Sequence, residues 1–173
     1  MVDAFHGLVR ELRRQRVRFV VIGVSGANYY AESAGLIFVT QDRDIFLPPD
    51  ASNARRAWRA CEASGLELFC GDEPLDRPRD SLLAREIVKR RALVRATGRG
   101  LDVDLTFVMA GFEFEVVWNG RRAFLLKGVR IPVARLSHIV ASKARAGRPK
   151  DRLFLATHEE ALRAFLESRR RSR

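Results

Sequence analysis

The stretch TQDRDIFLPP, residues 40–49, places two aspartates directly before a short apolar run. Residues 42–47 have the length and composition of a strand, and the prolines that follow end it because proline cannot donate a ladder hydrogen bond. Side chains alternate along a strand, so Asp42 and Asp44 share a face with Phe46. Two interpretations follow from the residues: an exposed acidic start of a strand, or a carboxylate pair that binds Mg²⁺, a cation that prefers oxygen ligands.

A second acidic strand is predicted at residues 101–108. Every second residue from Leu101 to Phe107 is apolar, while Asp102 and Asp104 lie between them, so one face is core and the other presents carboxylates. A carboxylate from this strand would complete a two-metal site with the first pair, and such a site supports in-line phosphoryl or nucleotidyl transfer. Alternation alone leaves both aspartates, and a plain solvent-facing strand, as possibilities.

A glycine-rich turn precedes both acidic strands. The apolar run VRFVVI, residues 17–22, predicts a buried strand, and Gly23-Val24-Ser25-Gly26 then leads into a helix. Glycines let backbone N–H groups approach an oxyanion, and a helix N-terminus favours negative charge. A plain turn is an equally good interpretation, because glycine is common wherever a strand turns into a helix.

The rest of the chain alternates between helical and extended patterns, without internal repeats or a clear linker. We predict one domain over residues 1–173, of class α+β, with a mixed sheet flanked by helices in a core of about 15–134 and C-terminal helices at about 135–170. The predicted helices are 3–15, 27–34, 51–64, 81–90, 112–117, 135–146 and 151–170. The predicted strands are 17–22, 36–39, 42–47, 66–69, 92–96 and 101–108, with an extended segment at 121–133.

The net charge of +11 suggests a polyanionic partner such as RNA, DNA or a nucleotide. The alternative is compositional, because nearly all the basic residues are arginine and GC-rich coding favours arginine. No apolar run has the length of a membrane span, and the N-terminus carries charges where a signal peptide is apolar. We therefore expect a cytoplasmic protein that does not associate with membranes.

The segments FVVIGVSGANYY (19–30), TQDRDIFL (40–47) and LDVDLTF (101–107) together resemble the nucleotidyltransferase superfamily related to DNA polymerase beta. Its hallmark is a Gly-Gly or Gly-Ser turn, then Asp-x-Asp, then a third aspartate on a later strand. The strongest likeness is to the small bacterial nucleotidyltransferases grouped with abortive-infection type II toxins and with the minimal nucleotidyltransferases of toxin–antitoxin pairs. The segment IPVARLSHIVASKARAGRPKD (131–151) also resembles that group, and the likeness covers about residues 15–160.

The resemblance implies that Asp42 and Asp44 hold the Mg²⁺ ions that bind a nucleoside triphosphate. Asp104 would be the third carboxylate, either as a metal ligand or as the base for the acceptor hydroxyl. We prefer it to Asp102 because the Asp-Leu-Thr sequence that it begins fits the family pattern better. Arg43 departs from the pattern, since the family usually has an apolar residue between the two aspartates.

By the same resemblance, Gly23 and Ser25 would line the phosphate turn, and Lys143 and Lys150 would neutralise phosphate charge. Val24 stands where the family usually has glycine or serine, which weakens the assignment of the turn. For both lysines the alternative is a solvated helix face.

The activity that the resemblance implies is Mg²⁺-dependent transfer of a nucleoside monophosphate from a triphosphate to a hydroxyl of RNA or protein. The setting would be a toxin–antitoxin pair or phage defence. The alternative is a catalytically silent protein of the same fold that serves as an antitoxin partner or as an RNA-binding module. The choice of nucleotide, the acceptor and the toxin or antitoxin role stay open.

Overall fold

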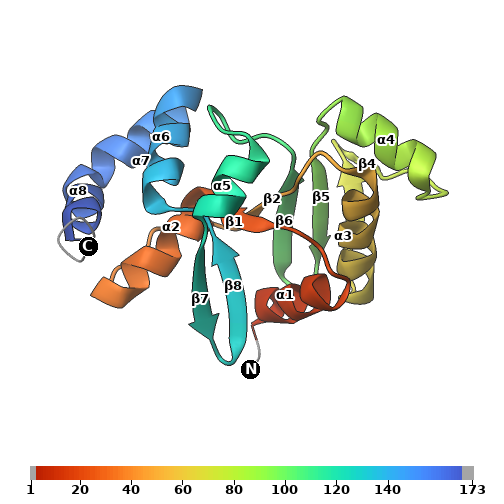
Figure 1. Cartoon of the computed structure of the whole chain (residues 1–173), viewed down its shortest axis with the longest axis horizontal. Coiled ribbons are helices and arrows are strands. Elements are labelled where there is room, and N and C mark those ends of the chain that lie inside the picture. Colours follow the sequence, from red (N-terminus) through yellow and green to blue (C-terminus); the bar gives the residue numbers. More distant parts are fainter. Residues whose placement is uncertain (1–2, 169–173) are drawn as a thin grey trace.

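The computed structural model describes residues 3–168, and for Ser33 the backbone alone (Figure 1). Helices alternate with strands along the chain, and a short 3₁₀ helix, η1 (Glu32–Ala34), follows α2. The α-helices are α1 (Ala4–Arg14), α2 (Gly23–Ala31), α3 (Ala51–Ala63), α4 (Ser81–Lys89), α5 (Phe114–Gly120), α6 (Leu136–Ala146), α7 (Pro149–Thr157) and α8 (Glu159–Ser168). The strands are β1 (Val20–Ile22), β2 (Asp42–Phe46), β3 (Glu67–Cys70), β4 (Glu73–Pro74), β5 (Val94–Gly98), β6 (Leu101–Thr106), β7 (Arg122–Leu126) and β8 (Val129–Val133).

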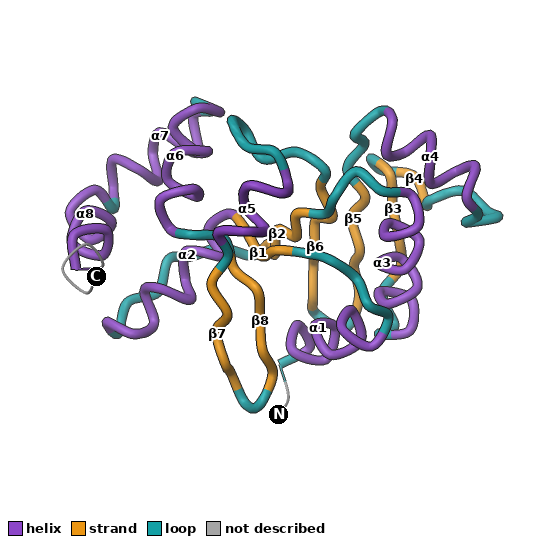
Figure 2. Tube along the Cα trace, viewed as in Figure 1, coloured by secondary structure: helices purple, strands orange, loops and turns teal. Residues whose placement is uncertain are grey.

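These strands form one mixed sheet in the order β4-β3-β5-β6-β2-β1-β8-β7. The acidic strand β2 lies near its centre, antiparallel to β1 and parallel to β6. β1 runs parallel to β8, and β7 and β8 form an antiparallel hairpin that projects away from the rest of the molecule (Figure 2). The predicted α+β class, with a mixed sheet and a C-terminal helical part, is therefore confirmed.

The apolar face of the central strands is core. Ile45 and Leu47 are fully buried, and so are Val103 and Leu105 on the neighbouring strand β6. Helices α1 and α3 pack together beside this part of the sheet (Figure 1). Arg43 points to the same side, because its guanidinium lies 5.5 Å from the centroid of the Phe5 ring of α1. The arginine that departs from the family pattern thus packs over an aromatic ring and leaves the opposite face to the aspartates.

The ends of the helices follow local capping chemistry. The side chain of Asp3 accepts a hydrogen bond from the backbone of Phe5 and caps α1. Asp50 and Asp80 cap α3 and α4 in the same way. No helix among residues 3–168 has both the length and the apolar character to cross a membrane.

The predicted strand at 36–39 is wrong, since this segment pairs with no strand in the described structure. The side-chain amide of Asn28 donates to the carbonyl of Phe38 at 2.8 Å, and its oxygen accepts from the Phe38 amide at 2.6 Å. The backbone of Phe38 is therefore bound to a helix side chain and not to a neighbouring strand. Ile37 and Val39, on either side, are 76% and 95% exposed.

Three predicted helices have clearly different bounds, and one of them, predicted at 112–117, is α5 (Phe114–Gly120). The helix predicted at 27–34 begins at Gly23, directly after β1, and its last turn is the 3₁₀ helix η1. The helix predicted at 151–170 is two helices, α7 and α8, separated at His158. The His158 ring lies 4.6 Å from the ring of Phe38 and 5.0 Å from that of Phe154, so the break packs against the rest of the protein. Residues 169–170 lie outside the described part of the chain.

Candidate active site

Four carboxylates lie in two pairs on the face of the sheet opposite to α1. Asp42 is directly opposite Asp102, and Asp44 is directly opposite Asp104, on the adjacent parallel strands β2 and β6. Side chains opposite each other on adjacent strands point to the same face. The structure therefore brings the predicted Asp42, Asp44 and Asp104 onto one surface, together with the alternative Asp102.

Strand β5 supplies a partner for each aspartate of β6. Arg95 is opposite Asp104, and its Nε and Nη2 donate to the two carboxylate oxygens at 2.8 and 3.3 Å. Thr97 is opposite Asp102 and donates its hydroxyl to that carboxylate. Arg95 could not be found from the sequence alone, because its position next to Asp104 depends on the register between two strands and on no local motif.

Gly23 forms the turn that covers Asp44. Its φ of +67° lies in the left-handed region, where side chains other than glycine are strained. A Cβ at this position would lie 2.1 Å from Oδ2 of Asp44, a distance that no real contact allows. Glycine is therefore required here on two grounds, the backbone conformation and the close approach of the turn to the carboxylate.

Ser25 is placed inside the protein. Its side chain is fully buried, and its Oγ donates to the carbonyl of Ile22 at 3.0 Å and accepts from the amide of Asp44 at 3.3 Å. The hydroxyl thus links the end of β1 and the start of α2 to the middle of β2. Its described contacts connect protein groups, whereas the resemblance implied a position lining the phosphate turn.

The electrostatics of Asp44 reflect its surroundings. Burial raises its pKa to about 6, with further contributions from the negative charges of Asp104 and Asp42, while Lys143 and Lys150 oppose the shift. The carboxyl group is therefore costly to ionise, first because it is buried and then because two other carboxylates lie near it. A cation bound on this face would remove that cost.

The two lysines come from the corner between α6 and α7. Lys143 donates to Asp151 at 2.9 Å, and its Nζ lies 5.0 Å from the centroid of the Phe154 ring. Arg148 donates to the other oxygen of Asp151 at 2.6 Å, and the Asp151 side chain is fully buried. Burial raises the pKa of Asp151, but the hydrogen bonds from Arg148 and Lys143 outweigh it and hold the pKa below its ordinary value.

Lys150 lies at the same corner and is exposed. Together with Lys143 it acts on Asp44 through its charge, and Arg148 also interacts electrostatically with that carboxylate. The C-terminal helices therefore bring positive charge towards the acidic face, and the phosphate-binding role of the two lysines stays a prediction. The basic sequence Arg148-Pro149-Lys150 is the local signal from which Arg148 could have been predicted.

The donor chemistry of the acidic face suits a hard divalent cation, because all its ligands would be carboxylate oxygens. Among residues 3–168, however, no group of three or more histidine, cysteine, aspartate or glutamate side chains is arranged to hold a metal ion. Arg95 engages both oxygens of Asp104. The carboxylate oxygens of Asp42 and Asp44 are of the type that such a cation prefers, whereas a cation could use those of Asp104 only in place of Arg95.

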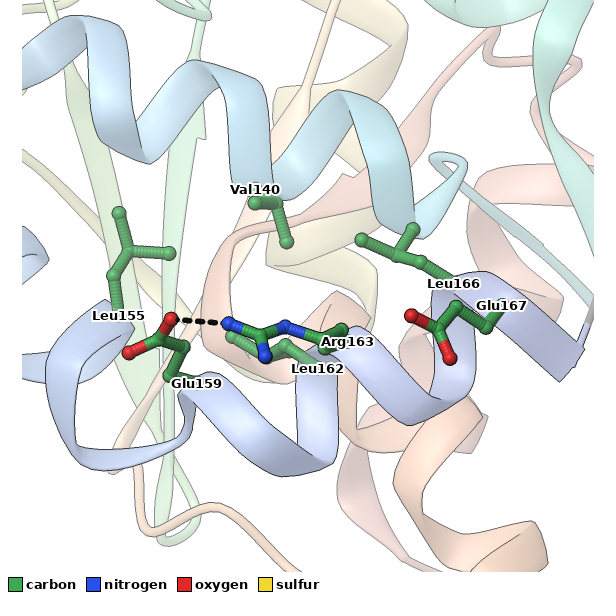
Figure 3. Close-up of a pocket in the computed structure, with 7 residues that line it drawn as sticks. All are labelled: Val140, Leu155, Glu159, Leu162, Arg163, Leu166 and Glu167. Carbon is green, nitrogen blue, oxygen red and sulfur yellow. Dashed lines mark hydrogen bonds and ion pairs between the residues drawn. The ribbon is translucent and has the colours of Figure 1, made fainter.

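A separate apolar groove of ≈ 420 Å³ lies on the C-terminal helices (Figure 3). Its rim carries an ion pair between Glu159 and Arg163 at 2.6 Å. None of the predicted site residues lines it, so the groove and the acidic face are different surfaces of the molecule. The lining residues are Val140, Leu155, Glu159, Leu162, Arg163, Leu166 and Glu167.

The chain matches no protein-family model and, at a significant level, no curated protein. Among solved structures it is similar to the solution structure of the antibiotic-resistance factor ANT(2'')-Ia, an aminoglycoside nucleotidyltransferase. The TM-score is 0.53 and the sequence identity 16%, over 98% of this chain and 92% of that chain. The chain has a nucleotidyltransferase-like fold. A likeness at this identity is one of fold, and it leaves the toxin subfamily suggested by the sequence as a prediction.

Proposed function

We propose that the protein transfers a nucleoside monophosphate from a nucleoside triphosphate to a hydroxyl group and releases pyrophosphate. The observation that carries the proposal is the pair Asp42 and Asp44 on β2, placed under the Gly23 turn and opposite the aspartates of β6. The nucleotidyltransferase-like fold supports the same reaction class.

In this reaction the oxygen of the acceptor hydroxyl bonds to the α-phosphorus, and the bond from that phosphorus to the oxygen of the leaving pyrophosphate breaks. The hydroxyl proton passes to a carboxylate, for which we propose Asp104. Mg²⁺ bound to the carboxylates would supply charge stabilisation for the triphosphate and the leaving group. Asp42 and Asp44 would be its ligands, with Asp104 as a third ligand or as the base.

The remaining residues would position the triphosphate. The Gly23 turn leads straight into α2, so the backbone N–H groups at the start of that helix are candidates for phosphate oxygens. Lys150 is exposed at the α6–α7 corner and acts on Asp44 through its charge, which suits a phosphate-binding role. Lys143 is tied to Asp151, so we assign it a smaller share of phosphate binding and a larger share in holding the corner together.

For the acceptor we propose a hydroxyl of RNA or protein. The net charge of +11 favours a polyanion, and the resemblance to small bacterial toxins favours a macromolecule within a toxin–antitoxin or phage-defence system. Because ANT(2'')-Ia is an aminoglycoside nucleotidyltransferase, an aminoglycoside belongs among the acceptors to be tested. We also propose a cytoplasmic location, where nucleoside triphosphates are abundant.

One observation favours a second function. Arg95 satisfies both oxygens of Asp104 within the protein, as would be expected of a site that no longer binds metal. The corresponding candidate is a catalytically silent protein of the same fold, acting as an antitoxin partner or as an RNA-binding module. RNA binding of that kind would weaken steeply with salt, because it depends on counterion release.

The test is incubation of the full chain with each labelled nucleoside triphosphate, Mg²⁺ and a panel of acceptors: cell RNA, cell protein and an aminoglycoside. We expect label on one acceptor class with the wild type and none with Asp42→Asn or Asp44→Asn. Asp102→Asn, on the same face, is the matched control and should keep activity if Asp104 is the third carboxylate. Calorimetric binding of the Mg²⁺–triphosphate complex that is equal in wild type and both β2 variants would contradict the proposal.

A further inference from the structure

Resting on this proposed function, we propose that Arg95 is a positioning residue that closes the third carboxylate of the site, Asp104, in the resting protein. Its guanidinium occupies the carboxylate oxygens that a divalent cation would take, and it gives way when the cation and the triphosphate bind. Cation binding and nucleotide binding are thereby coupled through one side chain.

The geometry of the pair supports this role. The two parallel hydrogen bonds, at 2.8 and 3.3 Å, form the planar fork with which arginine binds a carboxylate. Both carboxylate oxygens of Asp104 accept hydrogen bonds from Arg95, so they are not free to coordinate a cation on the acidic face. A guanidinium and a divalent cation compete for the same atoms and cannot occupy them together.

The partner that moves is Arg95. Its side chain is 49% exposed, whereas that of Asp104 is 15% exposed and stands on β6, one of the central strands. The Arg95 end of the ion pair is half in water, so its guanidinium can leave the carboxylate and be solvated. The carboxylate can therefore be released without any shift of the sheet.

Charge also favours Arg95 as a stand-in for the cation. Among the ion pairs of residues 3–168, Asp104 is the one aspartate of the four on this face that has a partner. Asp42 and Asp102 also interact favourably with the Arg95 charge, so this charge acts on aspartates of both β2 and β6. When a cation replaces it, the freed guanidinium stays above the same face, where a triphosphate supplies the balancing negative charge.

The test measures Mn²⁺ binding to the full chain by the electron paramagnetic resonance signal of free Mn²⁺, first without nucleotide. Arg95→Ala should bind Mn²⁺ more tightly than wild type by about fivefold, the factor that corresponds to releasing one exposed ion pair. Arg95→Gln should also bind Mn²⁺ more tightly than wild type, and it keeps more of the side-chain volume if the alanine variant folds poorly. Thr97→Val, on the same strand and face, is the control and should bind Mn²⁺ like wild type.

The second measurement repeats the titration with a non-hydrolysable ATP analogue. In wild type the analogue should tighten Mn²⁺ binding more than it does in Arg95→Ala, because coupling between two ligands through a residue is lost with that residue. Mn²⁺ binding that is unchanged or weaker in both Arg95 variants would overturn the inference. That result leaves the proposed function standing if Asp42→Asn abolishes Mn²⁺ binding, whereas binding that survives Asp42→Asn contradicts the proposed function itself.

Discussion

Gly23 and Asp44 approach each other so closely that a single methyl group on the glycine would lie 2.1 Å from Oδ2 of the aspartate. Ile22, the residue before the glycine, is directly opposite Asp44 in the β1–β2 ladder. The turn is thus fixed against the carboxylate by strand pairing on one side and by the start of α2 on the other. Any side chain at position 23 must displace Asp44 from its place on the acidic face.

Gly23→Ala should therefore abolish cation and nucleotide binding, as well as lower stability. Gly35→Ala is a matched control, because Gly35 has φ +70° and nothing within 4 Å of the place that a Cβ would take. Both variants should lose about 1–2 kcal/mol of stability, because alanine is strained in the left-handed backbone conformation. Any further loss of stability in Gly23→Ala measures the collision with Asp44. Urea denaturation and calorimetry with Mg²⁺ and ATP measure the two effects. Equal nucleotide affinity in both variants would show that the turn has no part in the site.

Ser25→Ala tests whether the hydroxyl is structural. Its removal takes a hydrogen-bond partner from the carbonyl of Ile22 and another from the amide of Asp44, so we expect a loss of about 1–3 kcal/mol in the free energy of unfolding. Ser52→Ala is the control, since Ser52 is exposed and accepts a hydrogen bond from the Arg56 side chain. A phosphate-binding hydroxyl would give the opposite pattern: unchanged stability with weakened nucleotide affinity.

The acidic face could be predicted because it depends on strand periodicity. Alternation places Asp42 and Asp44 on one face of the first strand, and Asp102 and Asp104 on one face of the second, provided that both segments are strands. Both strands could be predicted from their own residues alone. The resemblance implied only a third aspartate on a later strand, and the direct opposition of the aspartates across the parallel pair β2–β6 is known from the register of the structure.

What the sequence could not supply depends on contacts between distant segments. Arg95 meets Asp104 through the β5–β6 register, and nothing around position 95 marks it as part of a site. The apolar run at 36–39 has the composition of a strand, yet Asn28 binds the backbone of Phe38 and prevents pairing. Likewise, the helical pattern after residue 151 continues past His158, where packing against Phe38 accompanies the break.

Asp44→Asn should stabilise the cation-free protein at neutral pH. The folded-state pKa of Asp44, about 6, is above its ordinary value of 3.8, so the folded state binds the proton more tightly than the unfolded state does. The free energy of unfolding therefore falls as the pH rises from 3.8 to 6 and stays low above that range. Removing the charge should restore up to about 3 kcal/mol at pH 7 to 8.

Urea denaturation in EDTA between about pH 3.5 and 8 measures this difference, which should disappear near the acidic end of that range. Asp42→Asn, exposed on the same strand, is the control and should give a smaller change. A stability difference between Asp44→Asn and wild type that does not vary with pH would mean that burial and the neighbouring carboxylates do not raise the pKa of Asp44.

Asp151 should be the most sensitive position of the C-terminal corner. Its carboxylate is fully buried between Lys143, which is 12% exposed, and Arg148, which is 59% exposed. Asp151→Ala leaves the Lys143 ammonium buried without its partner, so the loss should reach about 3–5 kcal/mol. Arg148→Ala removes a mostly exposed group and should cost less than about 1 kcal/mol. If both variants lose the same stability in urea denaturation, the corner does not depend on the buried pair.

The pH dependence of the same corner has the opposite sign to that of Asp44. The folded-state pKa of Asp151 is held below its ordinary value of 3.8, so its ion pairs contribute their full stability above that pH and lose it as the pH falls through the lowered pKa. Lys143→Met in the Asp151→Ala background should recover part of the lost stability, because it removes the unpaired charge. A double variant no more stable than Asp151→Ala alone would show that the buried ammonium is not the source of the cost.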